Sequence, residues 1–276
     1  MATQRPTAEI LDQLREGIAT LTTSDKWAQW LDAQGRFHRY SFGNTLLILL
    51  QRPEAIQVAG FHTWRRLGRQ VRKGEKGIVI LAPIAPRIRV EDENGQERVI
   101  AGTARAFHTA YVFDISQTDG PDLPSIVERL EGEDPDRVFL RLIKTAASVG
   151  YSVEFAEFGD ERNGDCTFAE HRIRIRQGLS PAQSVKTLAH ELAHALLHGE
   201  DFDGTRDLAE LEAESVAFVV CQSIDLDSSA YTFGYVASWA GGGSDAVRAI
   251  TASGQRIVRT ARQVLDCESA NEQIAA

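Results

Sequence analysis

The sequence predicts an α+β protein of two domains: a small α+β N-terminal domain and a mainly helical C-terminal domain with a small sheet. Three observations predict this. The 276 residues suffice for two ordinary domains, and both helical periodicity and strand-like alternation occur along the chain. The stretch QTDGPDLP at 117–124 has the composition of a linker. We therefore expect domains at residues 1–120 and 134–276, joined by residues 121–133.

The N-terminal half is expected to mix helices and strands. Apolar residues at helical spacing predict a long helix over 7–33 and a second over about 41–51, which stops before Pro53. A short helix is expected over 63–67. Strands are predicted over 78–81, 87–90, 98–101 and 105–113, and the turn DENGQ makes the middle two a hairpin.

The C-terminal half is expected to be helices around two strands. The strands are predicted over 151–155 and 171–176, the second because His-Arg-Ile-Arg-Ile-Arg alternates polar and apolar residues. Ser180 and Pro181 are typical of the cap and first turn of a helix, which we expect to reach about His198. Further helices are predicted over 134–149, 207–222, 231–240 and 246–265.

Charge is distributed unevenly along the chain, whose net charge is −9. Between Arg36 and Val90, eleven Lys and Arg residues stand against two acidic residues, a local charge of +9 that leaves −18 for the rest. Such asymmetry indicates two domains with different partners.

Membrane and secreted proteins are disfavoured. No apolar run is long enough to span a bilayer, and the N-terminus lacks the basic start and apolar stretch of a secretory signal. We therefore expect a cytoplasmic protein without a membrane partner. The three cysteines, Cys166, Cys221 and Cys267, are scattered and form no CxxC pair, so we expect reduced thiols.

The stretch TLAHELAHALLHGE carries the pattern H-E-x-x-H on a predicted helix. His190 and His194 are four residues apart, so both imidazoles project from one helix face and can reach one zinc ion. Glu191 is suited to contact a metal-bound water and to take its proton as general base. The pattern is a recognised metalloprotease signature, and it predicts a zinc-dependent metallopeptidase with a single zinc ion.

A third protein ligand is expected from the following helix. His198 is too distant, because eight residues span about 12 Å along a helix, and we interpret it as a helix-end residue or one that supports a ligand. Glu210 lies 16 residues after His194 and shares a helix face with Glu214. This favours Glu210 as the ligand and Glu214 as a hydrogen-bond acceptor for a ligating imidazole. Glu212, on another face, is the alternative ligand.

The stretch WRRLGRQVRKGEKG concentrates basic residues at 64–77. Cations beside aromatic faces are what single-stranded nucleic acid requires, and aromatic residues lie nearby at Phe37, Tyr40, Phe42, Phe61 and Trp64. The candidate phosphate contacts are Arg65, Arg66, Arg69, Arg72, Lys73 and Lys76, with Trp64 and Tyr40 as candidate stacking residues. In the alternative interpretation the aromatic side chains, Trp64 included, form core and the charges form a solvated face.

Several stretches carry family resemblances. YSFGNTLLILLQRPEA, VAGFHTWRRLGRQVRKGEKGIVILAPI and AYVFDISQTDG resemble, in that order, the N-terminal domain of ArdC-like antirestriction proteins, and GYVASWA at 234–240 resembles the C-terminal portion of that family. TLAHELAHALLH followed by E-L-E-A-E-x-x-A resembles the ImmA/IrrE-type metallopeptidases, which are gluzincin-like. Their pattern is HELxH followed by E-x-x-A-[ND]-x-x-A.

The resemblance implies a single-stranded-DNA-binding domain fused to a zinc metallopeptidase domain that serves mobile DNA entering a cell. It implies Glu210 as a ligand and puts Glu214 where the family has Asn or Asp, a departure that bears on the supporting role of Glu214. It also implies that the strand at 171–176 pairs with an extended peptide substrate.

Three functions compete at this point. The leading one is a cytoplasmic zinc peptidase that binds single-stranded DNA and cleaves, or holds, a protein partner in antirestriction. The second is a non-proteolytic DNA-binding protein with a structural zinc site, and the third is a regulatory protease that cleaves a repressor. Glu191 argues against the second, because a structural zinc site does not need a general base.

Overall fold

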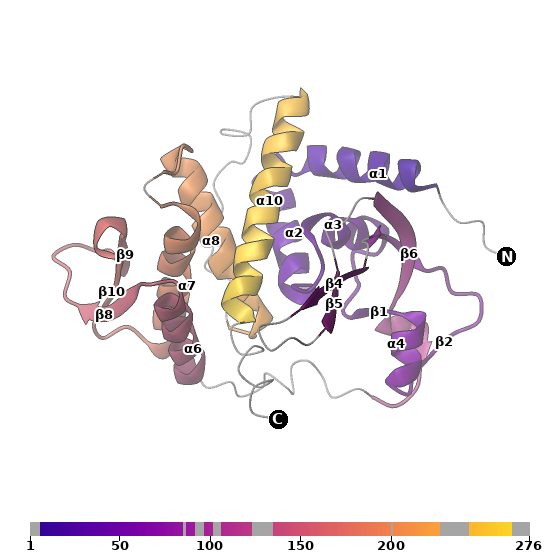
Figure 1. Ribbon diagram of the computed structural model, residues 1–276, viewed down its shortest axis with the longest axis horizontal. Coiled ribbons are helices and arrows are strands. Elements are labelled where there is room, and N and C mark those ends of the chain that lie inside the picture. Colours follow the sequence, from indigo (N-terminus) through magenta and orange to yellow (C-terminus); the bar gives the residue numbers. More distant parts are fainter. Residues whose placement is uncertain are drawn as a thin grey trace. The chain divides into compact units, whose positions relative to one another are not determined.

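The computed structural model describes residues 6–84, 87–91, 97–101, 106–122, 135–199, 201–226 and 243–266. The chain divides into two compact units, each described by itself below. The N-terminal unit comprises Met1–Gly17 and Leu46–Pro121, and the C-terminal unit comprises Ile18–Thr45 and Asp122–Ala276. Both units contain helices and strands (Figure 1), which confirms the predicted α+β class.

The N-terminal unit is built on a three-stranded antiparallel sheet in the order β1, β6, β3. The strands of this sheet are β1 (Val58–Gly60), β3 (Ile78–Ile84) and β6 (Ala106–Asp114). Two antiparallel pairs accompany it: β2 (Gln70–Val71) with β7 (Thr118–Asp119), and β4 (Arg87–Glu91) with β5 (Glu97–Ala101). The second pair is the predicted hairpin. Strands β1, β2 and β7 were not predicted, because two or three residues carry no readable alternation.

Apolar residues from α1 (Thr7–Thr20), α3 (Phe42–Gln51) and β3 form the core of this unit. The buried members are Ile10, Leu47, Val79 and Leu81, with Leu14 and Tyr111 packed against them. Trp64, in α4 (Phe61–Arg66), is fully buried, and its indole Nε1–H donates to the carbonyl of Phe113 at 2.9 Å. The short helix that carries Arg65 and Arg66, two of the six basic residues, is therefore anchored to β6 by its tryptophan.

Asp114 ties the end of β6 to the segment before β1. Its carboxylate accepts from the backbone N–H groups of Ile56 at 2.8 Å, Gln57 at 3.1 Å and Ser116 at 2.9 Å. Burial raises the pKa of Asp114, but hydrogen bonds from Ser116, Ile56 and Gln57 outweigh burial and lower the pKa below its usual value. The Asp114 carboxylate thus joins the end of β6 to the two residues that precede β1.

The C-terminal unit is a helical layer with a small sheet. Its helices include α2 (Ser24–Arg36), α6 (Pro135–Ser148), α7 (Pro181–Leu197), α8 (Arg206–Ser223) and α10 (Gly243–Leu265). Helix α7 packs against α6, α8 and α10, and also against the sheet of β8 (Ser152–Ala156), β10 (Arg172–Arg176) and β9 (Gly164–Thr167). The sheet order is β8, β10, β9 (Figure 1), with β10 parallel to β8 and antiparallel to β9.

The single helix expected over 7–33 is two helices. The hydroxyl of Thr23 accepts from the N–H of Lys26 and caps α2, so the chain breaks between Thr20 and Ser24. Residues 18–45, expected in the N-terminal domain, fall in the C-terminal unit. The reason is packing: the indole of Trp27 in α2 donates to Ser215 in α8 at 3.1 Å, and both side chains are fully buried.

Some predictions fall outside the described residues. They are the helix at 231–240 with its GYVASWA motif, the turn at 92–96, most of the linker at 121–133, and Cys267. Among the described helices, none combines the length and the apolar character that crossing a membrane requires.

Candidate metal centre and basic surface

Helix α7 presents His190 and His194 on one face. Ser180 caps the helix by accepting from the N–H of Gln183 at 3.3 Å, and Pro181 occupies its first turn. The opposite face buries apolar residues such as Leu188 and Leu192. The two histidines therefore point away from the core on successive turns, and their Nε2 atoms lie 3.1 Å apart.

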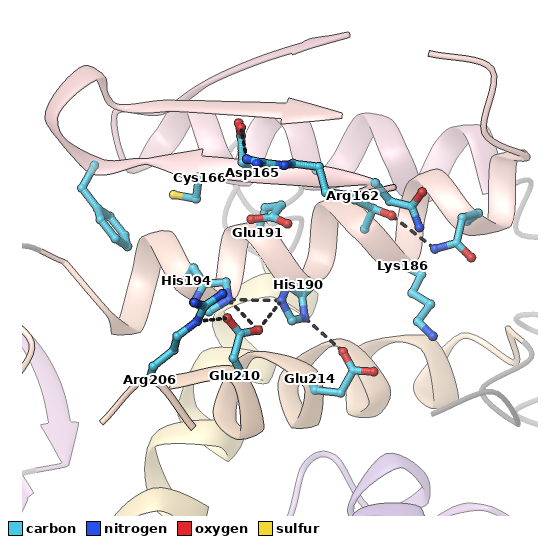
Figure 2. Close-up of a pocket in the computed structure, with 15 residues that line it drawn as sticks. Arg162, Asp165, Cys166, Lys186, His190, Glu191, His194, Arg206, Glu210 and Glu214 are labelled. Atoms are coloured by element: carbon cyan, nitrogen blue, oxygen red, sulfur yellow. Dashed lines mark hydrogen bonds and ion pairs between the residues drawn. The ribbon is translucent and has the colours of Figure 1, made fainter. Parts of the chain in front are cut away.

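Helix α8 brings Glu210 to the same point (Figure 2). Thr205 caps this helix by accepting from Leu208 N–H, which begins α8 one turn before the glutamate. Glu210 Oε2 lies 3.5 Å from His190 Nε2 and 3.7 Å from His194 Nε2. All three candidate ligand atoms lie within 4.8 Å of one another.

These separations suit a metal ion. Tetrahedral zinc with bonds of about 2.0–2.1 Å holds neighbouring ligand atoms about 3.3 Å apart. The three observed separations of 3.1, 3.5 and 3.7 Å bracket that value. Two imidazole nitrogens and a carboxylate oxygen also form the usual donor set of a catalytic zinc site with an open fourth position.

The pKa of His190 is governed by burial and by the two carboxylates beside it. Burial lowers the pKa of His190, but hydrogen bonds to Glu210 and Glu214 outweigh it and raise the pKa to about 9. Hydrogen bonds to His190 and His194 hold the pKa of Glu210 far below its usual value. The carboxylate and the imidazoles thus compensate one another's charge across a small gap.

Further side chains contact the two imidazoles on their outer sides. His190 Nδ1 lies 3.1 Å from Glu214 Oε2, and His194 Nδ1 lies 3.0 Å from His198 Nδ1. Glu212, which the sequence left open as an alternative ligand, points elsewhere: its Oε2 lies 3.2 Å from His198 Nε2, and Arg256 on α10 donates to it. Nothing in the sequence indicated Arg256, because it lies 44 residues from Glu212.

Glu191 lies beside the three candidate ligands and is mostly buried. Burial raises its pKa, and the charges of His190 and His194 only partly offset that rise. Glu191 lines a cleft of about 670 Å³ together with the candidate ligands, Cys166 and Lys186 (Figure 2). Burial raises the pKa of Cys166 to about 12, so it remains a neutral thiol there.

The strand beside Glu191 in this cleft is β9, which the sequence analysis missed. Its four residues Gly-Asp-Cys-Thr are too short to show a pattern. Gly164 lies directly on α7: a Cβ there would approach Thr187 Cγ2 to 2.7 Å and Glu191 Cγ to 3.0 Å. Only glycine lets the strand lie this close to the helix without displacing Glu191.

The sequence resemblance had implied that the strand at 171–176 pairs with substrate, and the topology corrects this. That strand is β10, which lies between β8 and β9 and has a ladder on both sides. Strands β8 and β9 are the two edges of this sheet in the described residues, and β9 is the edge strand whose residues line the cleft. Arg176 N–H donates to Asn163 O at 2.7 Å, so by antiparallel alternation the backbone groups of Gly164 and Cys166 point away from β10.

The candidate phosphate contacts divide into two groups. Arg65, Arg66, Lys73 and Lys76 are exposed. Arg69 is buried, and its guanidinium donates to Thr118 Oγ1 at 2.7 Å and to the carbonyl of Gly120 at 3.1 Å. Arg72 pairs with Glu75 at 2.9 Å and with Asp119 at 3.4 Å. Both of these arginines therefore hold β2 and β7 together.

The two candidate stacking residues, Trp64 and Tyr40, fall in different units. The core interpretation holds for Trp64, which is 0% exposed. Tyr40 belongs to the C-terminal unit, where its ring meets Phe37 edge-on. Phe61 is the exposed aromatic of α4, at 42% exposure. It lies four residues before Arg65, a spacing that puts both on one helix face and that could have indicated it.

Comparison with known proteins gives two family matches. Residues 1–113 match the model of the N-terminal domain of anti-restriction factor ArdC, and residues 146–224 match the model of the IrrE N-terminal-like domain, a peptidase family. An uncharacterized protein of Bacillus anthracis is 25% identical over 281 residues, which cover 87% of this chain. The chain spans about half the length of that relative, 47%.

Two crystal structures of the antirestriction ArdC protein from plasmid R388 are among the similar solved structures. The metal-free structure has 24% identity and a TM-score of 0.49, with 84% of each chain covered. The Mn(II)-bound structure has 21% identity and a TM-score of 0.47, with 98% of this chain and 97% of the other covered. By the two family matches, residues 1–113 form a domain of the ArdC N-terminal type and residues 146–224 form an IrrE-like domain of the peptidase family, as the two sequence resemblances predicted.

Proposed function

We propose that the C-terminal unit is a zinc-dependent metallopeptidase with one zinc ion, held by His190, His194 and Glu210. The observation that carries this proposal is the convergence of two Nε2 atoms and one carboxylate oxygen at separations of 3.1, 3.5 and 3.7 Å. When bound, zinc supplies Lewis acidity toward a peptide carbonyl and lowers the pKa of a coordinated water.

Glu191 is the general base in this proposal. It accepts a proton from the attacking water and can return it to the leaving amine. Its buried position raises its pKa, which suits a group that both accepts and donates a proton. His190 and His194 keep their Nε2 atoms directed at the metal position, and neither takes part in the proton transfer.

The substrate in this proposal is an extended peptide paired with the open edge of β9. The outward N–H and C=O groups of Gly164 and Cys166 provide hydrogen bonds for a strand laid along the cleft. Such pairing places a substrate carbonyl beside Glu191 without requiring a deep pocket for any one side chain. The protein partner of the antirestriction function would be bound, and cleaved, here.

The N-terminal unit, we propose, binds single-stranded DNA. Arg65, Arg66, Lys73 and Lys76 contact phosphates, and Phe61 offers its ring to a base. Within the described part of the chain, none of these four cations forms an ion pair. Gly74 lies between the two lysines at φ +91° with open space around it, so a phosphate can approach the main chain there. Together with the peptidase unit this suggests an antirestriction protein of mobile DNA.

Glu191→Gln in the full chain tests the peptidase proposal. We expect zinc content to remain at one ion per chain, while hydrolysis of a peptide library falls by about 10²–10⁴-fold, the usual contribution of a general base. Zinc is measured by elemental analysis and hydrolysis by mass spectrometry. Antirestriction that persists at full strength in this variant would favour the non-proteolytic alternative, and intact hydrolysis would remove Glu191 from the mechanism.

Phe61→Leu tests the stacking role, with Leu67→Ala as the matched control. Phe61 and Leu67 are 42% and 43% exposed, so both substitutions alter a similar apolar surface. Loss of a stacked ring is expected to weaken binding of a single-stranded oligonucleotide by about 1–3 kcal/mol. The control should bind like the wild type. Equal effects of the two substitutions would discard Phe61 as a stacking residue.

A further inference from the structure

A buried chain of side chains leads from His194 away from the metal centre. His194 Nδ1 lies 3.0 Å from His198 Nδ1, and His198 Nε2 lies 3.2 Å from Glu212 Oε2. Arg256 on α10 donates its Nε–H toward both oxygens of Glu212, at 3.1 and 3.2 Å. The side chains of His198 and Glu212 are 3% and 0% exposed, so bulk water cannot replace these contacts.

The chemistry of the partners determines where the protons lie. A carboxylate only accepts hydrogen bonds, so His198 carries its proton on Nε2, which faces Glu212. With its proton on Nε2, the His198 ring accepts at Nδ1. The proton between the two rings is consequently on His194 Nδ1, which leaves the lone pair on His194 Nε2. That atom is the one 3.1 Å from His190 Nε2 and 3.7 Å from Glu210 Oε2.

We propose that Glu212 and Arg256 are positioning residues of the metal centre, which act through His198 to hold His194 in its metal-binding tautomer and ring orientation. This inference rests on the proposed metal site. Partners on the outer side of a ligating histidine commonly have this role. Arg256 lies outside residues 146–224, the part that matches the peptidase family. Helix α10 is therefore part of the functional metallopeptidase unit of this chain.

The two ligating imidazoles are held in different ways. Glu214, which contacts His190, has a side chain that is 28% exposed, so water can substitute for it. His194 depends instead on a second imidazole and a fully buried carboxylate. Removal of Arg256 would leave that carboxylate without its cation in the interior, where an unpaired charge is costly. Glu212 would then be expected to move and to release His198.

Glu212→Gln tests the direction of the protons in the full chain. Two of the contacts from Arg256 go to Oε1, which must remain an acceptor, so the amide oxygen turns to Arg256 and the amide N–H faces His198 Nε2. The chain of donors then reverses and places a proton on His194 Nε2. We expect zinc affinity, measured by competition with a chromophoric chelator, to fall about 10–100-fold. Imidazole ¹⁵N spectra of the metal-free protein should show the changed tautomer of His194.

Ser215→Ala is the matched control on the same helix. It removes a buried hydrogen bond, to Trp27, that lies outside the imidazole network. It should lower the melting temperature without changing zinc affinity or the tautomer of His194. Arg256→Lys should retain more zinc affinity than Arg256→Ala, because lysine keeps a cation beside Glu212.

The outcomes separate this inference from the proposed function. Wild-type protein that binds no zinc would overturn both. Wild-type binding together with unchanged affinity and unchanged His194 spectra in Glu212→Gln would overturn the positioning role alone. If that variant does not fold, the arginine pair decides: equal zinc affinity in Arg256→Lys, Arg256→Ala and wild type would contradict the proposal.

Discussion

The metal centre and the basic surface differ in how their charged residues are used. In the C-terminal unit, charged groups from α7, α8 and α10 contact one another, and each contact orients the next group toward one point. In the N-terminal unit, Arg69 and Arg72 hold strands β2 and β7, and only part of the basic cluster remains exposed. The spacing of a metal-binding motif predicts where its side chains lie, because they must all reach one ion. The spacing of a basic cluster does not predict which of its side chains are exposed.

The largest effect is expected from removing a candidate ligand. His190→Ala and Glu210→Ala each delete one of three donors and should reduce zinc affinity by more than the roughly 10–100-fold typical of residues that only support a ligand. Isothermal titration with zinc measures this. Full zinc retention in Glu210→Ala would place the third donor elsewhere. The contrast with the basic surface would then fail, because the charged groups of α7 and α8 would not converge on one ion.

Gly164→Ala should impair catalysis while leaving the metal in place. The added Cβ would lie 2.7 Å from Thr187 Cγ2 and 3.0 Å from Glu191 Cγ, so the strand or Glu191 must shift. Such a misplacement is expected to lower kcat/KM about 10- to 100-fold. Gly159→Ala, with nothing within 4 Å of the new Cβ, is the control. Matching kinetics of the two variants would show that β9 does not set the position of Glu191.

Replacing Lys73 and Lys76 together by Gln should weaken binding of single-stranded DNA and reduce the slope of its salt dependence by about 1.4, or 0.7 for each lost phosphate contact. Arg72→Gln is the control, because its guanidinium already pairs with Glu75 and Asp119. Fluorescence anisotropy over a range of salt concentrations measures both. If Arg72→Gln lost more DNA affinity than the double lysine variant, Arg72 would have to leave its acidic partners and contact phosphates on binding.

The smallest effect concerns the acid sensitivity of the N-terminal unit. The pKa of Asp114 is lowered in the fold, so its contribution to stability is present above its unfolded pKa of about 3.9 and is lost as pH falls through the folded value. Asp114→Asn should cost about 1–3 kcal/mol at pH 7. The difference from wild type should shrink toward pH 2 in hydrogen exchange of residues 52–60. A stability difference between Asp114→Asn and wild type that stays the same from pH 7 to pH 2 would show that the charge of Asp114 does not stabilise the fold.

Both families could be inferred from the amino-acid order, because each is carried by a local pattern. H-E-x-x-H is contained within one helix, and helical geometry alone places both imidazoles on one side. The helix pair α7 and α8 and the hairpin of β4 and β5 likewise follow from periodicity and turn residues. The break between α1 and α2, the three short strands of the N-terminal unit and β9 have no such pattern.

Whether a residue is available to a ligand was decided by packing between distant segments. Trp64 and Phe61 are three positions apart, yet one is buried against β6 and the other is exposed. Arg256 reaches Glu212 from 44 residues away, and β9 rather than β10 is the edge strand beside the cleft. The local order of residues sets which chemical groups share a helix face or strand. Which of these groups face water, one another or a substrate depends on contacts between elements remote in the chain, and these form only when the chain is folded.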